Sequence, residues 1–245
     1  MAGHSKFKNI MHRKGAQDAK RAKVFAKFGR ELMVAAKLGG DDPDMNPRLR
    51  TALAAAKAGN MPKDNIERAI KKGAGGGEDT NFEEMRYEGY GSGGVAFIVE
   101  ALTDNRNRTA SEVRTIFAKN GGNLAETGSV TFMFEQVGEL IYPCDVCDGD
   151  TMFEAAVEAG AENIESDDEN HRIVCAPDQL NDVRDHLEKL YGEAQSSSLQ
   201  WDPKNTVDVD HDTATKMFRL IDALEDNDDV QKVFANFEPP EDFEG

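Results

Sequence analysis

Cysteine is scarce in this sequence, which contains Cys144, Cys147 and Cys175 and no others. So few thiols, in an odd number, exclude the paired framework of a small extracellular protein. A structural zinc site needs four ligands, and only His171 and Cys175 could complete a set with the CxxC pair. Those two residues fall in an expected strand, and acids around the CxxC turn should raise the pKa of its thiols. We therefore expect surface-loop cysteines in a reduced chain that holds no metal and no other cofactor.

Long apolar runs are absent. No stretch approaches the ~20 apolar residues needed to cross a bilayer. The first ten residues, MAGHSKFKNI, also lack the apolar region of a secretory signal. We therefore expect a cytoplasmic protein that does not bind membranes.

Signatures of catalysis are missing as well. The sequence contains neither HExxH nor GxSxG. The glycine-rich residues 73–80 lead into acids rather than into the GK[ST] of a phosphate-binding loop, and the glycines of 89–94 precede a strand rather than the helix of a dinucleotide site. The carboxylates are scattered over polar faces, where they resemble ordinary surface charge. We expect no enzymatic activity.

Positive charge is scarce beyond residue 72. Residues 1–72 contain 17 Lys/Arg and 7 Asp/Glu, a net of +10, whereas the other 173 residues contain 12 and 39, a net of −27. The first thirty residues alone carry nine Lys/Arg and one acid, Asp18. Charge segregated in this way indicates that the N-terminal end binds nucleic acid or another anionic surface. The alternative is a solvated basic helix face.

Helices dominate the N-terminal third. Apolar positions spaced by three and four predict a helix over 17–38, and cap, proline and glycine signals predict two more over 46–59 and 62–73. Residues 73–80 then form a glycine-rich linker. On the first helix the apolar and basic positions form two separate stripes. We expect Lys20, Lys23, Lys27 and Arg30 to be exposed and Val24, Phe25, Phe28 and Leu32 to be buried.

Strands and helices alternate after residue 80. The expected elements are strands at 95–102 and 129–134 around a helix at 109–120, and then, after residue 202, a strand near 206–209, a helix at 213–225 capped by Asp212 or Thr213, and a strand at 230–236. Between these segments lies a complete strand–helix–strand–strand–helix–strand series: strands at 138–142, near 163–164, at 171–175 and near 198–201, and helices at 151–159 and 178–191. That order is the split βαβ arrangement of ferredoxin-like domains.

These elements predict a multidomain α+β fold. It consists of an N-terminal helical domain and two ferredoxin-like α+β domains, one inserted into the other. The expected limits are 1–78 for the helical domain with its linker, 79–136 with 203–245 for the discontinuous domain, and 137–202 for the insert. Residues 138–206 hold 17 Asp/Glu and 4 Lys/Arg, so the insert should not bind nucleic acid. The insert then either presents a solvated acidic face or contacts a basic protein surface.

The basic tract is the strongest binding candidate. Its lysines and arginines supply attraction to phosphates, and interleaved histidine, serine, asparagine and glutamine side chains can bond sugar or phosphate oxygens. A second candidate is the arginine pair just before the helix at 109–120, where the helix dipole favours an anion. Capping and local ion pairs are the equally weighted alternative there. The residues expected to contact nucleic acid are His4, Ser5, Lys6, Lys8, His12, Arg13, Lys14, Lys20, Arg21, Lys23, Lys27, Arg30, Arg106 and Arg108.

Motifs along essentially the whole chain resemble the YebC/PmpR family of transcriptional and translational regulators. This family includes the mitochondrial translational activator of cytochrome oxidase. The motifs are MAGHSKF, HRKGAQDAKR at 12–21, FAKFGREL, GGDDP, NPRLR, NMPKDNIERAIKKG at 60–73, YEGYG, LTDNRNRT at 102–109, GGNL and ALEDNDDVQKVFANFE at 223–238. Phe7 and Met11 stand where the family usually has Trp and Lys.

The resemblance implies a regulator of gene expression that binds nucleic acid. The resemblance points first to a DNA-binding transcriptional regulator. The alternative is a ribosome-associated translation factor that binds ribosomal RNA and relieves stalling at proline-rich stretches. No helix-turn-helix, zinc finger or basic zipper pattern is recognisable, which favours an RNA recognised by its shape. A protein-interaction adaptor is the third alternative. We expect the protein to be a monomer.

Overall fold

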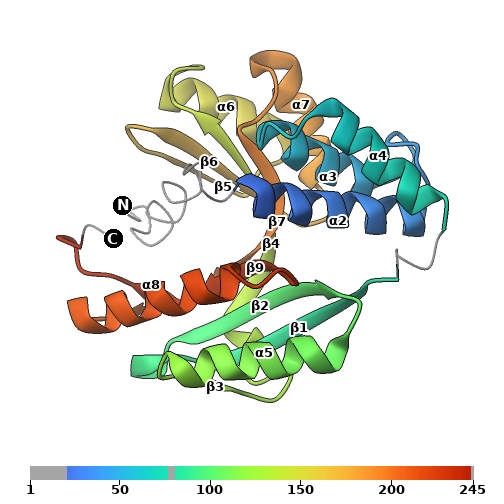
Figure 1. Cartoon of the computed structure of the whole chain (residues 1–245). Helices are drawn as coiled ribbons and strands as arrows, with labels where there is room; N and C mark the ends of the chain where they lie inside the picture. Colours follow the sequence, from blue (N-terminus) through green and yellow to red (C-terminus); the bar gives the residue numbers. More distant parts are fainter. Residues whose placement is uncertain (1–20, 77–80, 244–245) are drawn as a thin grey trace. The chain divides into compact units, whose positions relative to one another are not determined.

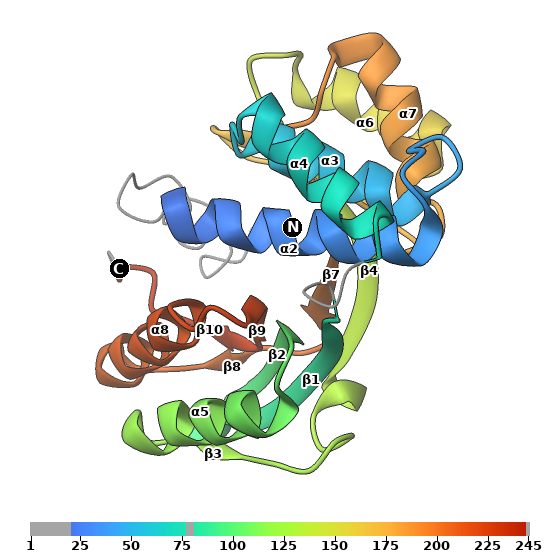
Figure 2. The same cartoon turned by 45° about the vertical axis from the view of Figure 1, so that its right-hand side comes forward.

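The computed structural model describes residues 21–76 and 81–243 of the 245-residue chain. These residues form two compact units, each assembled from separate segments of the chain. The first unit contains 81–135 and 201–243, with 21–23, and the second contains 24–76 and 136–200. Figures 1 and 2 show the elements of each. No helix of the described residues is long and apolar enough to cross a membrane.

Three helices form the N-terminal part of the second unit: α2 (Arg21–Gly39), α3 (Pro47–Ala58) and α4 (Lys63–Ala74). Asn46 is buried and joins the first two, because its side chain accepts from the Leu49 amide and donates to the carbonyl of Ala35, which lies within α2. Leu32 and Leu49 are fully buried in the small core between the helices. All three expected helices are confirmed, although residues 17–20 of the first lie outside the described part.

The expected linker is wrong at its start, because Gly73 and Ala74 belong to α4. Gly73 is buried, and a Cβ there would collide with the backbone carbonyl of Met33 in α2. Glycine is therefore required by the close approach of two helices, a need that the run of neighbouring glycines conceals.

We expect Gly73→Ala to lower the free energy of unfolding by about 1–3 kcal/mol, because backbone atoms must move apart. Gly29→Ala is the matched control, since Gly29 also lies in a helix and its nearest contact is an ordinary 3.8 Å to the Met61 side chain. That change should stabilise slightly through helix propensity. Urea titrations followed by circular dichroism measure both. Equal effects would contradict the packing role of Gly73.

The second unit also contains the inserted sheet. Its elements are β4 (Phe134–Pro143), α6 (Gly149–Ala159), β5 (Asn163–Ser166), β6 (Asn170–Cys175), α7 (Leu180–Tyr191) and β7 (Ser196–Pro203). The strand order is β5-β6-β4-β7, and β6 pairs antiparallel with both β4 and β5. Both helices pack on the face that buries Leu140, Tyr142 and Ile173. This is the ferredoxin-like order that the sequence predicts.

The first unit is built around a second four-stranded sheet. Its strands are β1 (Glu83–Tyr90), β2 (Ala96–Thr103), β3 (Asn123–Leu124) and β9 (Val230–Ala235), in the order β3-β1-β2-β9. Helices α5 (Arg106–Lys119) and α8 (His211–Glu225) are labelled in Figure 1. They bury Phe117 and Met217 in the same core on one face of this sheet. A short pair, β8 (Val207–Asp208) and β10 (Phe237–Glu238), and two 3₁₀ turns, η3 (Ser92–Gly94) and η4 (Thr131–Met133), complete the unit.

The multidomain α+β class is confirmed, with three differences inside this unit. Strand β1 is not expected from the sequence, so the unit starts with a hairpin and runs ββαβ before the insertion and αβ after it. The strand expected at 129–134 is wrong, since residues 131–133 form η4 and β4 starts at Phe134. The cap of α8 is Asp210, whose side chain accepts from the Thr213 amide, rather than Asp212 or Thr213.

Candidate nucleic-acid interface

Most of the expected basic tract lies outside the described residues. This applies to His4, Ser5, Lys6, Lys8, His12, Arg13, Lys14 and Lys20. Arg21 is the first residue of α2. The remaining expected residues, on α2 and at the start of α5, can be placed.

The expected division of α2 into two stripes holds only in part. Leu32 is fully buried, and Phe25 and Phe28 are half-buried against the helical core. Among the cations Lys23 is exposed, whereas Lys27 and Arg30 are half-buried and each interacts within the chain. Full exposure of this stripe is therefore wrong for two of its three described members.

Helix α3 carries three further cations, and all of them are engaged. Arg48 makes two hydrogen bonds with Glu31 of α2, at 2.7 Å and 3.1 Å. Arg50 donates to Asp185 at 3.1 Å, and Lys57 lies 3.2 Å from Glu193. A cation held by a carboxylate must break that pair to bind a phosphate, so α3 contributes little open positive charge.

Helix α4 presents the most open cations of the helical region. Arg68 and Lys71 are exposed and have no hydrogen-bond or ion-pair partner among the described residues. The opposite face of the helix buries Ile66, Ala69 and Gly73, which fixes the direction of the cationic face. The sequence interpretation missed these residues because it concentrated on the first thirty positions. The spacing of KDNIERAIKK contains the signal, since positions 68 and 71 lie opposite 66, 69 and 73 on a helical wheel.

The two arginines at the start of α5, Arg106 and Arg108, have different surroundings in the structure. The helix begins at Arg106, so both arginines lie in its first turn rather than in a preceding loop. The Asn105 side chain caps the helix by accepting from the Arg108 amide at 3.1 Å. Arg106 is 61% exposed and lies 3.5 Å from Glu83, which is equally exposed.

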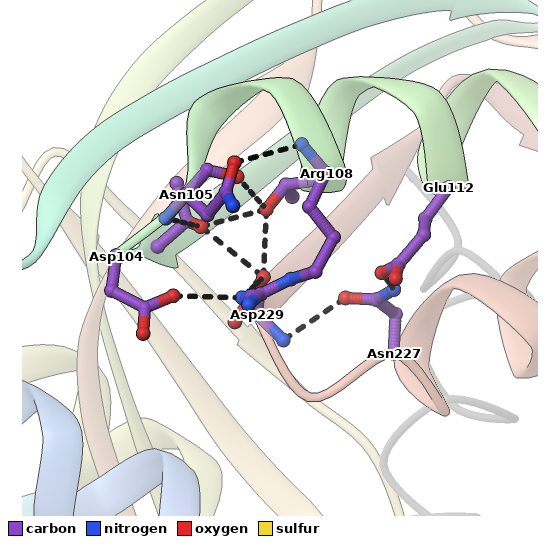
Figure 3. Close-up of polar contacts among 8 residues, drawn as sticks. Asp104, Asn105, Arg108, Glu112, Asn227 and Asp229 are labelled. Atoms are coloured by element: carbon purple, nitrogen blue, oxygen red, sulfur yellow. Dashed lines mark hydrogen bonds and ion pairs between the residues drawn. The ribbon is translucent and has the colours of Figure 1, made fainter.

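Arg108 has a structural role (Figure 3). Its Nη2 donates to Asp229 at 2.6 Å and to Asp104 at 2.8 Å. Hydrogen bonds to Asp229 and Asp104 raise the pKa of Arg108. Arg108 therefore forms local ion pairs, which was the alternative to anion binding at this position, and its guanidinium is already engaged.

Asp229 is the centre of the network in Figure 3. Its side chain is only 6% exposed, and its Oδ2 accepts from Thr109 at 2.7 Å and from Thr103 at 3.2 Å in addition to Arg108. Burial and the negative charge of Asp229 raise the pKa of nearby Tyr87. Three donors compensate the buried carboxylate, and they join the segment before the insertion to the segment after it.

The CxxC pair, Cys144 and Cys147, does not form a set of metal ligands with His171 and Cys175 in the described residues. Both ring nitrogens of buried His171 are occupied: Nδ1 lies 2.7 Å from Ser166 Oγ, and Nε2 lies 3.0 Å from the Cys147 carbonyl. Burial, and then the charge of Asp148, raise the pKa of Cys147, so the acidic turn acts in the expected direction but is the smaller cause. In the described residues no group of three or more His, Cys, Asp or Glu side chains could hold a metal ion.

The acidic insert offers few open cations. Arg172 is buried and donates to Glu139 at 2.6 Å and to Glu165 at 3.3 Å. Arg184, 2% exposed, pairs with Asp185 at 2.7 Å. With two of its three cations enclosed, the insert presents an even more acidic surface than its composition indicates.

Two family models and one solved structure match most of the chain. The model of the TACO1/YebC protein N-terminal domain matches residues 5–76. The model of the TACO1/YebC second and third domain, named Transcrip_reg, matches residues 82–237. The crystal structure of a conserved hypothetical protein from Aquifex aeolicus is 49% identical, with a TM-score of 0.86 over 93% of this chain and 94% of that one. The name of the second model marks its members as regulators of gene expression. The resemblance read from the motifs is thus confirmed, and the chain belongs to the TACO1/YebC family.

Proposed function

We propose that this protein is a non-enzymatic regulator of gene expression that binds nucleic acid through the helical domain. The observation that carries the proposal is the open cationic face of α4, where Arg68 and Lys71 project from a helix whose other face is packed. Phosphates bound there release counterions without first breaking an ion pair. The net charge of +10 over residues 1–72 supports binding by the same domain.

Duplex DNA is the first candidate target, because the family is named for transcriptional regulation. Ribosomal RNA, bound in a translation factor, is the second candidate. It is favoured by a cationic surface that carries no recognisable base-reading motif, since structured RNA is recognised largely by shape and backbone.

Fluorescence anisotropy with labelled duplex DNA and an RNA stem-loop of equal length, over a range of salt concentrations, tests the proposal. We expect the wild-type protein to bind at least one probe with a steep dependence on salt. In Arg68→Gln with Lys71→Gln, the log–log salt slope should flatten by about 2 units if each cation contacts one phosphate. The affinity at ~0.1 M salt should fall about tenfold to fiftyfold.

The matched control removes two exposed cations from α8, as Lys216→Gln with Arg219→Gln. It changes the net charge by the same amount, so slope and affinity should stay near the wild-type values. Absence of binding to both probes would overturn the proposed function. Equal losses in the two variants would show that overall charge, rather than the α4 face, controls binding.

A further inference from the structure

The outer helix α5 has the opposite charge to the unit that contains it. Residues 81–135 and 201–243 hold 9 Lys/Arg and 20 Asp/Glu, a net of −11, whereas α5 alone holds four and one, a net of +3. The neighbouring helix α8, which packs on the same face of the sheet, holds two basic and three acidic residues, a net of −1. A local excess of positive charge on one helix of an acidic unit is not required for solubility.

Two of the four α5 cations are open, and a third is held only by an exposed ion pair. Arg114 and Lys119 are exposed and have no hydrogen-bond or ion-pair partner within the described part of the chain. Arg106 has only its 3.5 Å pair with an exposed glutamate, and exposed pairs of this kind contribute little and break readily. The fourth, Arg108, is engaged by Asp229 and holds the first turn in place.

The rest of the exposed surface of α5 carries small or polar side chains and one acid, Glu112, whose carboxylate accepts a hydrogen bond from Asn227 at 2.7 Å. Asn107, Ser111 and Thr115 lie among the cations, and they can donate to or accept from sugar and phosphate oxygens. None of the large apolar side chains found exposed in the described residues belongs to this helix. Protein interfaces generally contain an apolar centre, so the chemistry of this face fits nucleic acid better than an acidic protein.

We propose that the exposed surface of α5, with Arg106 at its N-terminal end and Arg114 and Lys119 on its two flanks, is a second nucleic-acid contact site that binds the phosphodiester backbone. The proposal rests on the proposed function and adds a contact site in the other unit of the chain. The three cations span about 20 Å along the helix, which is the axial length of about six base pairs. Buried Thr109, Val113 and Phe117 hold one side of α5 against the core. The helical spacing places Arg114 and Lys119 on the two flanks of the remaining surface, with Arg106 at the N-terminal end of the helix.

The test compares two triple variants of the full chain in the same anisotropy assay. The first is Arg106→Gln, Arg114→Gln and Lys119→Gln. The second, with the same change in net charge in the same unit, is Lys204→Gln, Lys216→Gln and Arg219→Gln. We expect the α5 variant to flatten the log–log salt slope by about 2–3 units and to weaken binding at least tenfold. The control variant should change neither value appreciably, and circular dichroism should show both variants folded.

The outcomes separate this proposal from the proposed function. Wild-type affinity and slope in the α5 variant, together with weakened binding in the α4 variant, would overturn the α5 site alone. Equal losses in the two triple variants would also overturn it, because general electrostatics would then explain the effect. Failure of the wild-type protein to bind either probe would instead remove the proposed function.

Discussion

Glu88→Ala is expected to lower the free energy of unfolding by about 3–5 kcal/mol, because the buried Val130 amide and three partly buried donors lose their common acceptor. The Glu88 carboxylate is fully buried in β1 and accepts four hydrogen bonds from the loop that leads into β4. The donors are the amides of Gly128, Val130 and Thr131, at 2.9, 2.7 and 3.0 Å, and the Thr131 hydroxyl, at 2.6 Å. Urea unfolding gives the energy, and hydrogen exchange should show loss of protection at these three amides.

The Glu88 carboxylate should also make the free energy of unfolding depend on pH in the acid range. Burial by itself raises the pKa of Glu88, but the hydrogen bonds from Thr131, Val130 and Gly128 together outweigh it, so that the pKa is lower than that of an ordinary glutamate. A lowered folded-state pKa contributes stability at pH values above the unfolded-state pKa, which is about 4.3, and this contribution is lost as the pH falls through the folded value. Glu88→Gln should remove that part of the acid dependence.

Glu126→Ala is the control for this loop. Glu126 is exposed close to the same donors, and its side chain has no partner within the residues described, so the change should stay within about 0.5 kcal/mol. If Glu88→Ala were as mild as Glu126→Ala, the carboxylate would not be what holds the loop.

Asp229→Ala should cost a similar amount, about 3–5 kcal/mol, since a buried carboxylate paired with Arg108 is removed. Thr103 and Thr109 lose the same acceptor, and both threonines are fully buried. Thermal and urea unfolding measure the loss. Because Asp229 connects chain segments on the two sides of the insertion, hydrogen exchange should increase at the start of α5 as well as near β9.

Asp104→Ala provides the comparison, because Asp104 also binds Arg108 but is 61% exposed. An exposed ion pair of this kind is worth about 1 kcal/mol or less. The two variants therefore remove partners of the same guanidinium in different surroundings. Equal destabilisation would mean that burial of Asp229 is not the source of its effect.

Local patterns account for the elements that the sequence predicts correctly. Asn46 before Pro47 marks the start of α3, and the Asp148 side chain caps α6 by accepting from the Thr151 amide at 2.9 Å. The six-element order of the insert follows from hydrophobic periodicity, which is a property of neighbouring residues. The family follows from motifs distributed along the chain.

Strand β1 is concealed by its composition. Its sequence, EEMRYEGY, is rich in charge, and only Met85 and Tyr87 of its core-facing positions are apolar. Glu88, on the other face, is buried because a distant loop supplies its donors. The same carboxylate explains η4, since the amides of Val130 and Thr131 bond to it instead of extending a strand.

The helices, the ferredoxin-like order of the insert, the segregation of positive charge and the family can all be read from the amino-acid sequence. Which cations remain open depends on the folded chain. Arg108 and Arg50 are held by Asp229 and Asp185, which lie more than a hundred residues away in the chain, whereas Arg68 and Arg114 have no such partner among the described residues. The physical reason is that a charge-assisted hydrogen bond depends on a separation of about 3 Å in space, which composition and spacing along the chain do not specify.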